Sequence, residues 1–141
     1  MKIIVFPHEL SIGGSQINAI DLAAAVAAKG HEVLIYGTDG PLVGDIAERG
    51  LKFVKAHHFK YRPAPPKIIQ LMRLAREEKA DLIHTYEWPP CLDAYLGAGL
   101  FGHVPVIATI LDMVLSPFIP PLLPLIMGTA ELTEQARARR P

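Results

Sequence analysis

The stretch Lys2-Ile-Ile-Val-Phe6, with the loop Pro7-His-Glu-Leu-Ser-Ile-Gly-Gly-Ser15 and the alanine-rich segment behind it, decides the fold of this chain. The continuous apolar run predicts a strand that is covered on both faces. A helix is expected from about Ser15, a suitable N-cap, to Lys29. A strand, a glycine loop and a helix N-terminus in this order direct unpaired backbone N–H groups at one spot. An anion, usually a phosphate, is the expected ligand there.

Strands and helices alternate along the rest of the chain. Apolar runs predict the strands, and 3.6-residue periodicity with flanking glycine and proline predicts the helices. The expected strands are residues 2–6, 32–36, 51–54, 81–86, 104–109 and 125–129. The expected helices are residues 15–29, 42–49, 66–79, 90–102 and 131–140.

This alternation predicts an α/β fold, a Rossmann-like doubly wound parallel sheet of about six strands with helices on both faces. The expected strand order is 3-2-1-4-5-6, in which the chain reverses direction between the first and fourth strands. Ligands bind at the carboxyl ends of the strands at such a switch point. The loops at residues 8–15 and 87–90 are therefore expected to face each other, with Asp112 beside them.

Composition limits the classes of protein that fit. The 141 residues suit one domain, and 14 basic side chains balance 14 acidic ones, so no overall charge favours nucleic acid. The single cysteine, Cys91, excludes a disulfide within the chain and fits a cytoplasmic protein. The apolar stretch 104–127 contains five prolines and Asp112, which argues against a membrane-spanning helix there.

The glycine loop supplies the first candidate site. Gly13, Gly14 and Ser15 are predicted to form a loop that faces a phosphate, because glycine lets a ligand approach the backbone closely. The alternative is a tight loop without a ligand. The pair fits neither the dinucleotide motif G-x-G-x-x-G nor a Walker loop.

Polar residues in the facing loops supply the second group of candidates. His8 and Glu9 follow the first strand, and Glu87 and Trp88 follow the fourth. A carboxylate and an indole can hold a sugar by hydrogen bonds and stacking, although packing of Trp88 on its own loop is an equal alternative. Asp112, a carboxylate among apolar neighbours, must be paired or lie at the mouth of a site.

Other chemically active residues fit structural roles better. His84 lies inside a strand and is expected to be a core histidine. The adjacent His57 and His58 have no matching cluster of carboxylates or cysteines, so no metal site is predicted. Cys91 is expected to be an inert packed thiol, with a pKa lowered by the nearby helix N-terminus as the alternative.

Several of these segments together resemble the N-terminal half of family 4 glycosyltransferases with the GT-B fold. The resemblance rests on the first strand with Ile12-Gly-Gly-Ser-Gln16, and on the helix end and strand at residues 24–35. It also rests on Ala80-Asp-Leu-Ile-His-Thr-Tyr-Glu-Trp-Pro89, Pro105-Val-Ile-Ala-Thr109 and the helix start at Ala130. Each motif is loose, but their order and spacing are specific and extend over nearly the whole chain.

The resemblance implies transfer of a sugar from a UDP- or GDP-sugar donor to a sugar or lipid-linked acceptor, with retention of anomeric configuration and without a metal. Residues 1–141 would form the acceptor-side domain, with Gly13, Gly14 and Ser15 facing the donor. The acceptor would contact the loop residues named above. A C-terminal donor domain or partner half would hold most of the donor, so this chain alone is expected to be inactive. The family's setting implies a cytoplasmic protein, peripheral at the inner membrane face.

The chain departs from the family pattern after the fifth strand. The family often carries a histidine where this sequence has Leu111. Leucine neither donates a hydrogen bond nor transfers a proton, which favours a rival reading as a non-catalytic sugar- or nucleotide-binding module. A small nucleotide-dependent α/β enzyme is a second rival, with Asp39 as a ribose ligand.

Overall fold

The computed structural model describes residues 1–141. The strands are β1 (Lys2–Phe6), β2 (Glu32–Gly37), β3 (Lys52–Lys55), β4 (Leu82–Tyr86), β5 (Val106–Ile110) and β6 (Leu125–Met127). The helices are α1 (Gly14–Ala28), α2 (Val43–Glu48), α3 (Pro65–Glu77), α4 (Trp88–Ala94), a π-helical turn (Tyr95–Gly99) and α5 (Ala130–Arg139).

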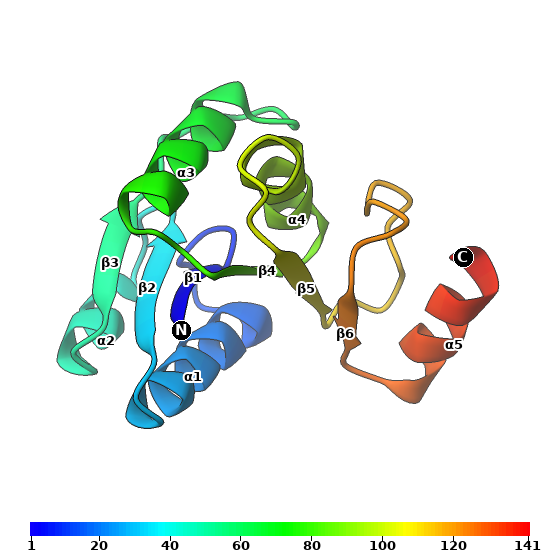
Figure 1. Cartoon of the computed structure of the whole chain (residues 1–141). Coiled ribbons are helices and arrows are strands. Elements are labelled where there is room, and N and C mark those ends of the chain that lie inside the picture. The colour runs from blue at the N-terminus through cyan, green and yellow to red at the C-terminus, as the bar shows by residue number, and fades with distance from the viewer.

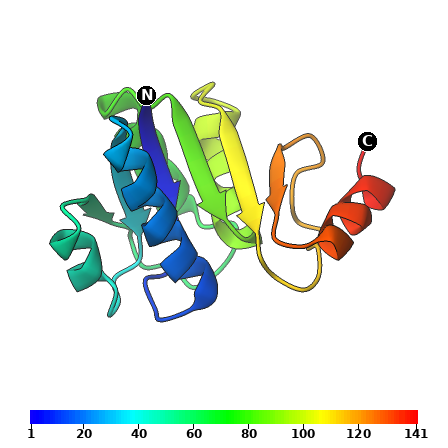
Figure 2. The same ribbon diagram turned by 90° about the horizontal axis from the view of Figure 1, so that it is seen from below.

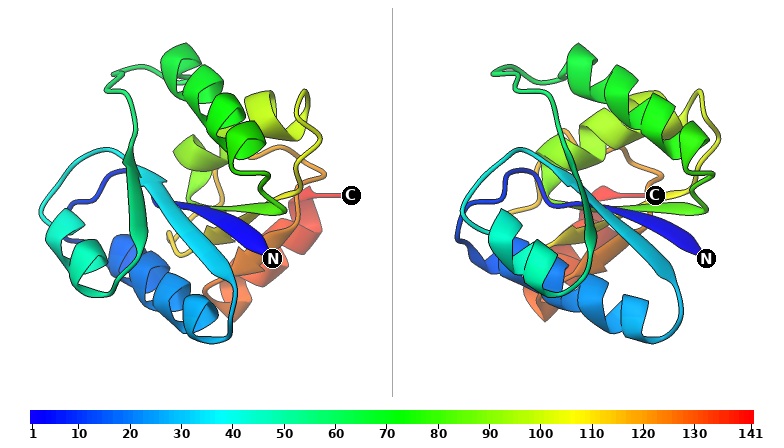
Figure 3. Two further views of the ribbon diagram at one scale, coloured as in Figure 1. Left: turned by 60° about the vertical axis from the view of Figure 1, so that its left-hand side comes forward. Right: turned by 90° about the vertical axis from the view of Figure 1, so that its left-hand side faces the viewer.

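The six strands form one parallel sheet in the order β3-β2-β1-β4-β5-β6, which confirms the predicted topology. Helices α1 and α2 cover one face, and α3 and α4 cover the other (Figures 1 and 2). Figure 3 shows α1 and α3 on opposite sides of the sheet in two further views. Helix α5 lies beyond β6 at the far edge (Figure 1).

Strand β1 supplies side chains to both halves of the core. Ile3 and Val5 pack with Ala19 and Ile20 of α1, whereas Ile4 and Phe6 pack with Leu71 and other residues of the α3 side. A strand alternates its side chains between the two faces of a sheet. Both faces of β1 are covered, which explains why its sequence is an unbroken apolar run.

Helix α1 begins differently from the prediction. Gly13, with φ −159° and ψ 160°, is the N-cap, and no side chain caps the helix. The predicted N-cap, Ser15, lies in the first turn and donates from Oγ to Gln16 Oε1 at 3.0 Å. The helix therefore starts on glycine backbone, and its first N–H groups have no side-chain acceptor.

Several other boundaries also differ from the prediction. The last strand ends at Met127 rather than residue 129, because Thr129 is the N-cap of α5 and its Oγ1 accepts from Leu132 N at 3.2 Å. Helix α4 starts at Trp88 and passes into a π-helical turn. A Cβ on Gly97 of that turn would lie 2.7 Å from Ile68 Cγ2, so only glycine permits this close packing against α3. No helix has the combined length and apolar character required to cross a bilayer.

His84 occupies the core, as predicted, and makes the stability of the fold sensitive to acid. Its side chain is buried, and Nε2 lies 2.7 Å from Thr109 Oγ1. Burial lowers the pKa of His84 to about 4. Between the ordinary pKa of about 6.5 and this value, the unfolded chain binds a proton that the folded chain excludes. Stability is therefore fully present above pH 6.5 and is lost as the pH falls toward 4.

We expect acidification from pH 7 to 4 to remove up to about 3 kcal/mol of unfolding free energy through His84. Urea unfolding at both pH values measures this loss in the wild type and in His84→Gln, whose amide can still reach Thr109. The variant should show a shallower pH dependence. An unchanged dependence would assign the acid sensitivity to other groups, among them His8, whose pKa is also lowered to about 4.

Candidate functional site

The loops at the carboxyl ends of β1 and β4 form the centre of the candidate site. Leu10 N donates to Thr38 O at 3.1 Å and Thr38 N donates to His8 O at 3.2 Å, so the loop after β2 supports the loop after β1. His8 and Glu87 both have positive φ, 43° and 62°. Such strained backbone in non-glycine residues costs about 1–3 kcal/mol and gathers at functional sites. Lys79 and His103 also have positive φ, just after α3 and after the π-helical turn, so the strain at His8 and Glu87 supports a site only together with their place at the switch point.

One open cleft, called the glycine cleft below, lies between the α1 N-terminus and the ends of β4 and β5. It has a volume of about 500 Å³. Its lining brings together four predicted site residues, with two others. The six are Gly14, Ser15, Asn18, Glu87, Leu111 and Asp112.

Backbone groups and carboxylates face each other across the glycine cleft. The first N–H groups of α1 have no intrahelical partner and carry the positive end of the helix dipole. A Cβ at Gly14 would meet nothing within 4 Å, so this position is open to an approaching ligand. Gly13 does not line the cleft, and a Cβ there would lie 2.5 Å from Gln16 Oε1.

Glu87 is fixed on the opposite wall. Its Oε1 accepts from Leu111 N at 2.9 Å. Burial raises the pKa of Glu87, the Leu111 amide opposes this rise, and the nearby Asp112 carboxylate adds to it. Asp112 itself is exposed at the cleft mouth, which satisfies the requirement that a carboxylate there be solvated.

A second open cleft, called the basic cleft below, lies on the other side of the β1 loop and has a volume of about 340 Å³. It contains the predicted residues His8, Glu9 and Trp88. Its full lining is His8, Glu9, Thr38, His58, Phe59, Lys60, Arg62, Lys67, Trp88 and Pro89. The predicted site residues thus divide between two clefts. Trp88 lines this cleft and packs on Phe118, in the segment after β5, with ring centroids 5.1 Å apart.

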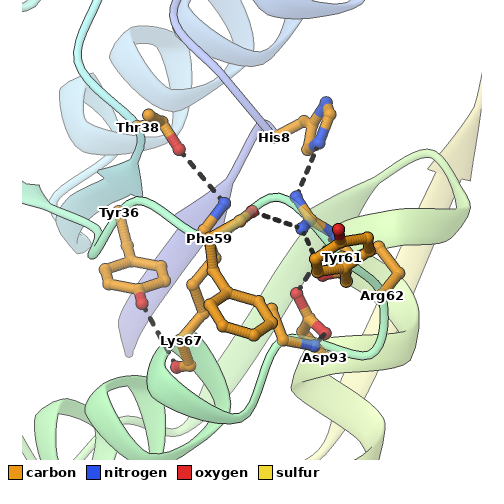
Figure 4. Close-up of polar contacts among 9 residues, drawn as sticks. His8, Tyr36, Thr38, Phe59, Tyr61, Arg62, Lys67 and Asp93 are labelled. Atoms are coloured by element: carbon orange, nitrogen blue, oxygen red, sulfur yellow. Dashed lines mark hydrogen bonds and ion pairs between the residues drawn. The ribbon is translucent and has the colours of Figure 1, made fainter.

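A buried charged network forms one wall of the basic cleft. The Arg62 guanidinium lies between His8 and Asp93 (Figure 4). Arg62 Nη2 is 2.9 Å from His8 Nε2, and Arg62 Nε is 3.5 Å from Asp93 Oδ2. Because a guanidinium only donates, His8 Nε2 must be the acceptor. Burial and the Arg62 charge lower the pKa of His8 to about 4, so its imidazole is neutral at pH 7.

Lys67 forms the floor of the basic cleft. Its side chain is 2% exposed, and Nζ lies 3.2 Å from Thr38 Oγ1. Figure 4 shows the Lys67 side chain directed toward Thr38 and the Lys67 carbonyl facing the Tyr36 hydroxyl. Tyr36 donates to that carbonyl at 3.2 Å. Burial, followed by the Arg62 charge, lowers the pKa of Lys67.

Three of these charged residues, Arg62, Lys67 and Asp93, are absent from the sequence prediction. The sequence contains a pattern that could have identified Lys67. It lies four and seven residues before Leu71 and Leu74, on the buried side of helix α3. A charge on such a stripe must be buried. Asp93 is likewise surrounded by apolar positions of α4.

The remaining candidates do not form a site. Cys91 is fully buried, and burial raises the pKa of its thiol to about 12, which confirms the expected inert thiol and excludes the alternative of a lowered pKa. His57 N donates to Gln70 Oε1 at 2.8 Å, which ties that loop to α3. No group of three or more histidine, cysteine, aspartate and glutamate side chains is arranged to hold a metal ion.

Comparison with known proteins identifies related folds and a family. The model of Glycosyltransferase Family 4 matches residues 12–128. The structure of Anabaena Alr3699/HepE in complex with UDP and glucose matches all of this chain with a TM-score of 0.74 and 14% identity. MurG of Acinetobacter baumannii also matches the whole chain, with a TM-score of 0.64 and 17% identity. A glycosyltransferase from Rickettsia africae ESF-5 matches 77% of it, with a TM-score of 0.64 and 19% identity.

These matches extend over only part of the other proteins. The chain spans 42% of the HepE structure, 50% of MurG and 29% of the Rickettsia enzyme. No curated protein sequence matches it significantly. At these identities the structural matches establish the fold, and the family model establishes the family.

Proposed function

Because this chain belongs to glycosyltransferase family 4, we propose that it is the acceptor-side domain of a GT-B enzyme. The enzyme transfers a sugar from a nucleotide-sugar donor to an acceptor with retention of anomeric configuration. The observation that carries the proposal is the glycine cleft, where the open Gly14 backbone faces Glu87 within the segment that the family model matches. The family assignment confirms the resemblance drawn from the sequence.

The donor is proposed to contact the glycine cleft through its phosphates. The α1 N-terminus offers unpaired N–H groups, which is the usual environment for a phosphate. HepE, which matches the whole chain, is described in complex with UDP and glucose, which supports a UDP-sugar; a GDP-sugar fits the same backbone contacts. Gly14 and Ser15 line this cleft, and Gly13 acts as the N-cap beneath it. No metal is proposed to take part.

The acceptor is proposed to occupy the basic cleft and to reach toward Glu87 and Asp112. His8, Glu9 and Trp88 line this cleft at the end of the loops that flank the switch point. Trp88 supplies an apolar surface for a sugar ring, and Glu9 supplies a hydrogen-bond acceptor. The acceptor is a sugar or a lipid-linked sugar.

A second domain is proposed to complete the enzyme and to hold most of the donor. The segment after β5 is the surface that the second domain would cover. Its apolar side chains are exposed, Met113 at 87%, Phe118 at 61% and Leu122 at 82%. Large exposed apolar side chains gathered on one segment mark interaction sites. The expected setting is the cytoplasm, peripheral at the inner membrane face. A sharply monodisperse monomer at high concentration would argue against this face as a docking surface.

The rival function is a binding module without catalysis. Leu111 supports it, because this side chain lines the glycine cleft where the family often has a histidine. A small nucleotide-dependent enzyme has less support, since Asp39 pairs with Lys55 at 3.1 Å rather than facing either cleft.

Titration of the 15N-labelled chain with UDP-glucose, followed by amide chemical shifts, tests the donor contact. The proposal predicts weak binding with shifts at Gly14, Ser15 and Leu111, and no release of glucose. Measurable sugar transfer by the chain alone would contradict the proposal that a second domain is needed. Shifts confined to other regions would contradict the assigned donor contact.

A further inference from the structure

Lys67 is a buried cation without a carboxylate partner. Its residue is 2% exposed, and its ammonium makes a single hydrogen bond, to Thr38 Oγ1 at 3.2 Å. An ammonium has three N–H donors, so two of them have no partner in the protein. Buried charges are almost always paired, because taking a lone charge out of water costs several kcal/mol. The arrangement therefore calls for an anion that the protein does not provide.

The nearby carboxylates do not fill this role. Asp93 accepts from Ala64 N at 2.9 Å and pairs with Arg62. Glu9 is exposed at the rim, and its Oε1 accepts from Ser11 Oγ at 3.3 Å. Neither forms an ion pair with Lys67.

The other groups around the basic cleft favour the same kind of ligand. The Arg62 donors are already directed at His8, Asp93 and the carbonyls of Phe59 and Tyr61, so Arg62 contributes a fixed charge beside Lys67. Lys60 and His58 line the outer wall. The Thr38 hydroxyl accepts from Lys67 and keeps its own O–H free to donate. The floor of the cleft thus presents three free donors, two N–H groups of Lys67 and the O–H of Thr38. The positive charges of Lys67 and Arg62 lie side by side there.

We propose that the basic cleft binds a phosphate monoester carried by the acceptor, with the phosphate on Lys67 and Thr38 and the Arg62 charge beside it. This inference rests on the proposed acceptor role of the cleft. A dianion suits two fixed cations better than a carboxylate does, and Trp88 at the same cleft leaves an apolar wall for the sugar that carries the phosphate. The donor diphosphate lies elsewhere, at Gly14 in the glycine cleft.

Inorganic phosphate is the probe that tests this site. Titration of the 15N-labelled chain at pH 7, against sodium chloride at equal ionic strength, should give saturable shifts at the Thr38, Lys67 and His8 amides. Phosphate should also raise the melting temperature more than acetate does. Absence of saturable shifts at these amides, or an equal effect of acetate, would overturn the assignment.

Lys67→Met identifies the group responsible, because methionine keeps the length of the side chain and removes the charge. The variant should fold with an equal or higher melting temperature without phosphate. Its phosphate affinity should fall roughly 10- to 100-fold, the change expected when charge-assisted hydrogen bonds are lost. Lys29→Met makes the same change at an exposed lysine outside both clefts and should bind phosphate normally. A lower melting temperature for Lys67→Met would indicate a structural lysine and overturn the proposal.

Two comparisons separate the possible sources of the phosphate. UDP should shift Gly14 and Ser15 equally in the wild type and in Lys67→Met. Loss of UDP binding in that variant would assign Lys67 to the donor and overturn the acceptor assignment. These titrations measure binding and not sugar transfer. If phosphate bound through Lys67 while the completed enzyme transferred no sugar, only the proposed function would be contradicted.

Discussion

Replacing Asp93 with alanine is expected to lower the free energy of unfolding by about 3–5 kcal/mol, the usual cost of removing one partner of a buried ion pair. The Asp93 side chain is fully buried, and Arg62, at 13% exposure, has no other carboxylate within reach. The substitution also leaves Ala64 N without its acceptor. Urea unfolding at pH 7 measures the change.

The structural role of Asp93 can be separated from a general effect of losing a carboxylate. Asp93→Asn keeps an acceptor for Ala64 N but loses the charge, so its free energy of unfolding should lie between those of the wild type and the alanine variant. Asp45→Ala removes a half-exposed carboxylate that pairs with Arg49 on the surface and should cost less than about 1 kcal/mol. If Asp93→Ala proved as mild as Asp45→Ala, the buried pair of Arg62 and Asp93 would not stabilise the fold in the way proposed.

Replacing Gly14 with leucine is expected to leave the fold intact and to reduce sugar transfer by the completed two-domain enzyme roughly 100-fold. A side chain at this position enters open space, since a Cβ would meet nothing within 4 Å. It would stand between the donor phosphates and the N–H groups of α1. Loss of one well-placed donor of this kind costs about 100-fold or more in turnover. Initial rates with a nucleotide-sugar donor measure the effect.

Gly44→Leu is the matched control for this substitution. Gly44 lies in α2, outside both clefts, and its Cβ would also meet nothing within 4 Å. Both variants should melt at or slightly above the wild-type temperature, because glycine is a poor helix residue. Equal transfer rates for the two variants would show that donor phosphates do not approach the α1 N-terminus.

The sequence predicted the fold well because the information is local. The apolar run Lys2–Phe6 marks a strand buried on both faces, shorter runs mark the edge strands β3 and β6, and the alternation with helices leaves few topologies open. The errors lie at the ends of helices and strands, where neighbouring residues compete for the capping position. Ser15 looked like an N-cap, but its hydroxyl bonds to Gln16 and leaves Gly13 in that role.

The candidate site was predicted in part, for a different reason. Residues that directly follow strands, such as His8, Glu87 and Asp112, can be placed by topology alone. Their division between two clefts cannot, because it depends on how the β1 loop is held by Thr38. The pairing of Arg62 with Asp93 joins the loop before α3 to helix α4, which are distant in sequence, and no local pattern reveals it.

Sugar transfer by the completed two-domain enzyme is the decisive measurement for the proposed function. The assay compares the product of the whole reading frame with the 141-residue chain, using radiolabelled nucleotide sugars. If the frame ends at Pro141, a separately encoded donor domain is added. We expect transfer with retained configuration only when both domains are present. Transfer by the 141-residue chain alone, or none by the complete assembly with any nucleotide sugar, would contradict it.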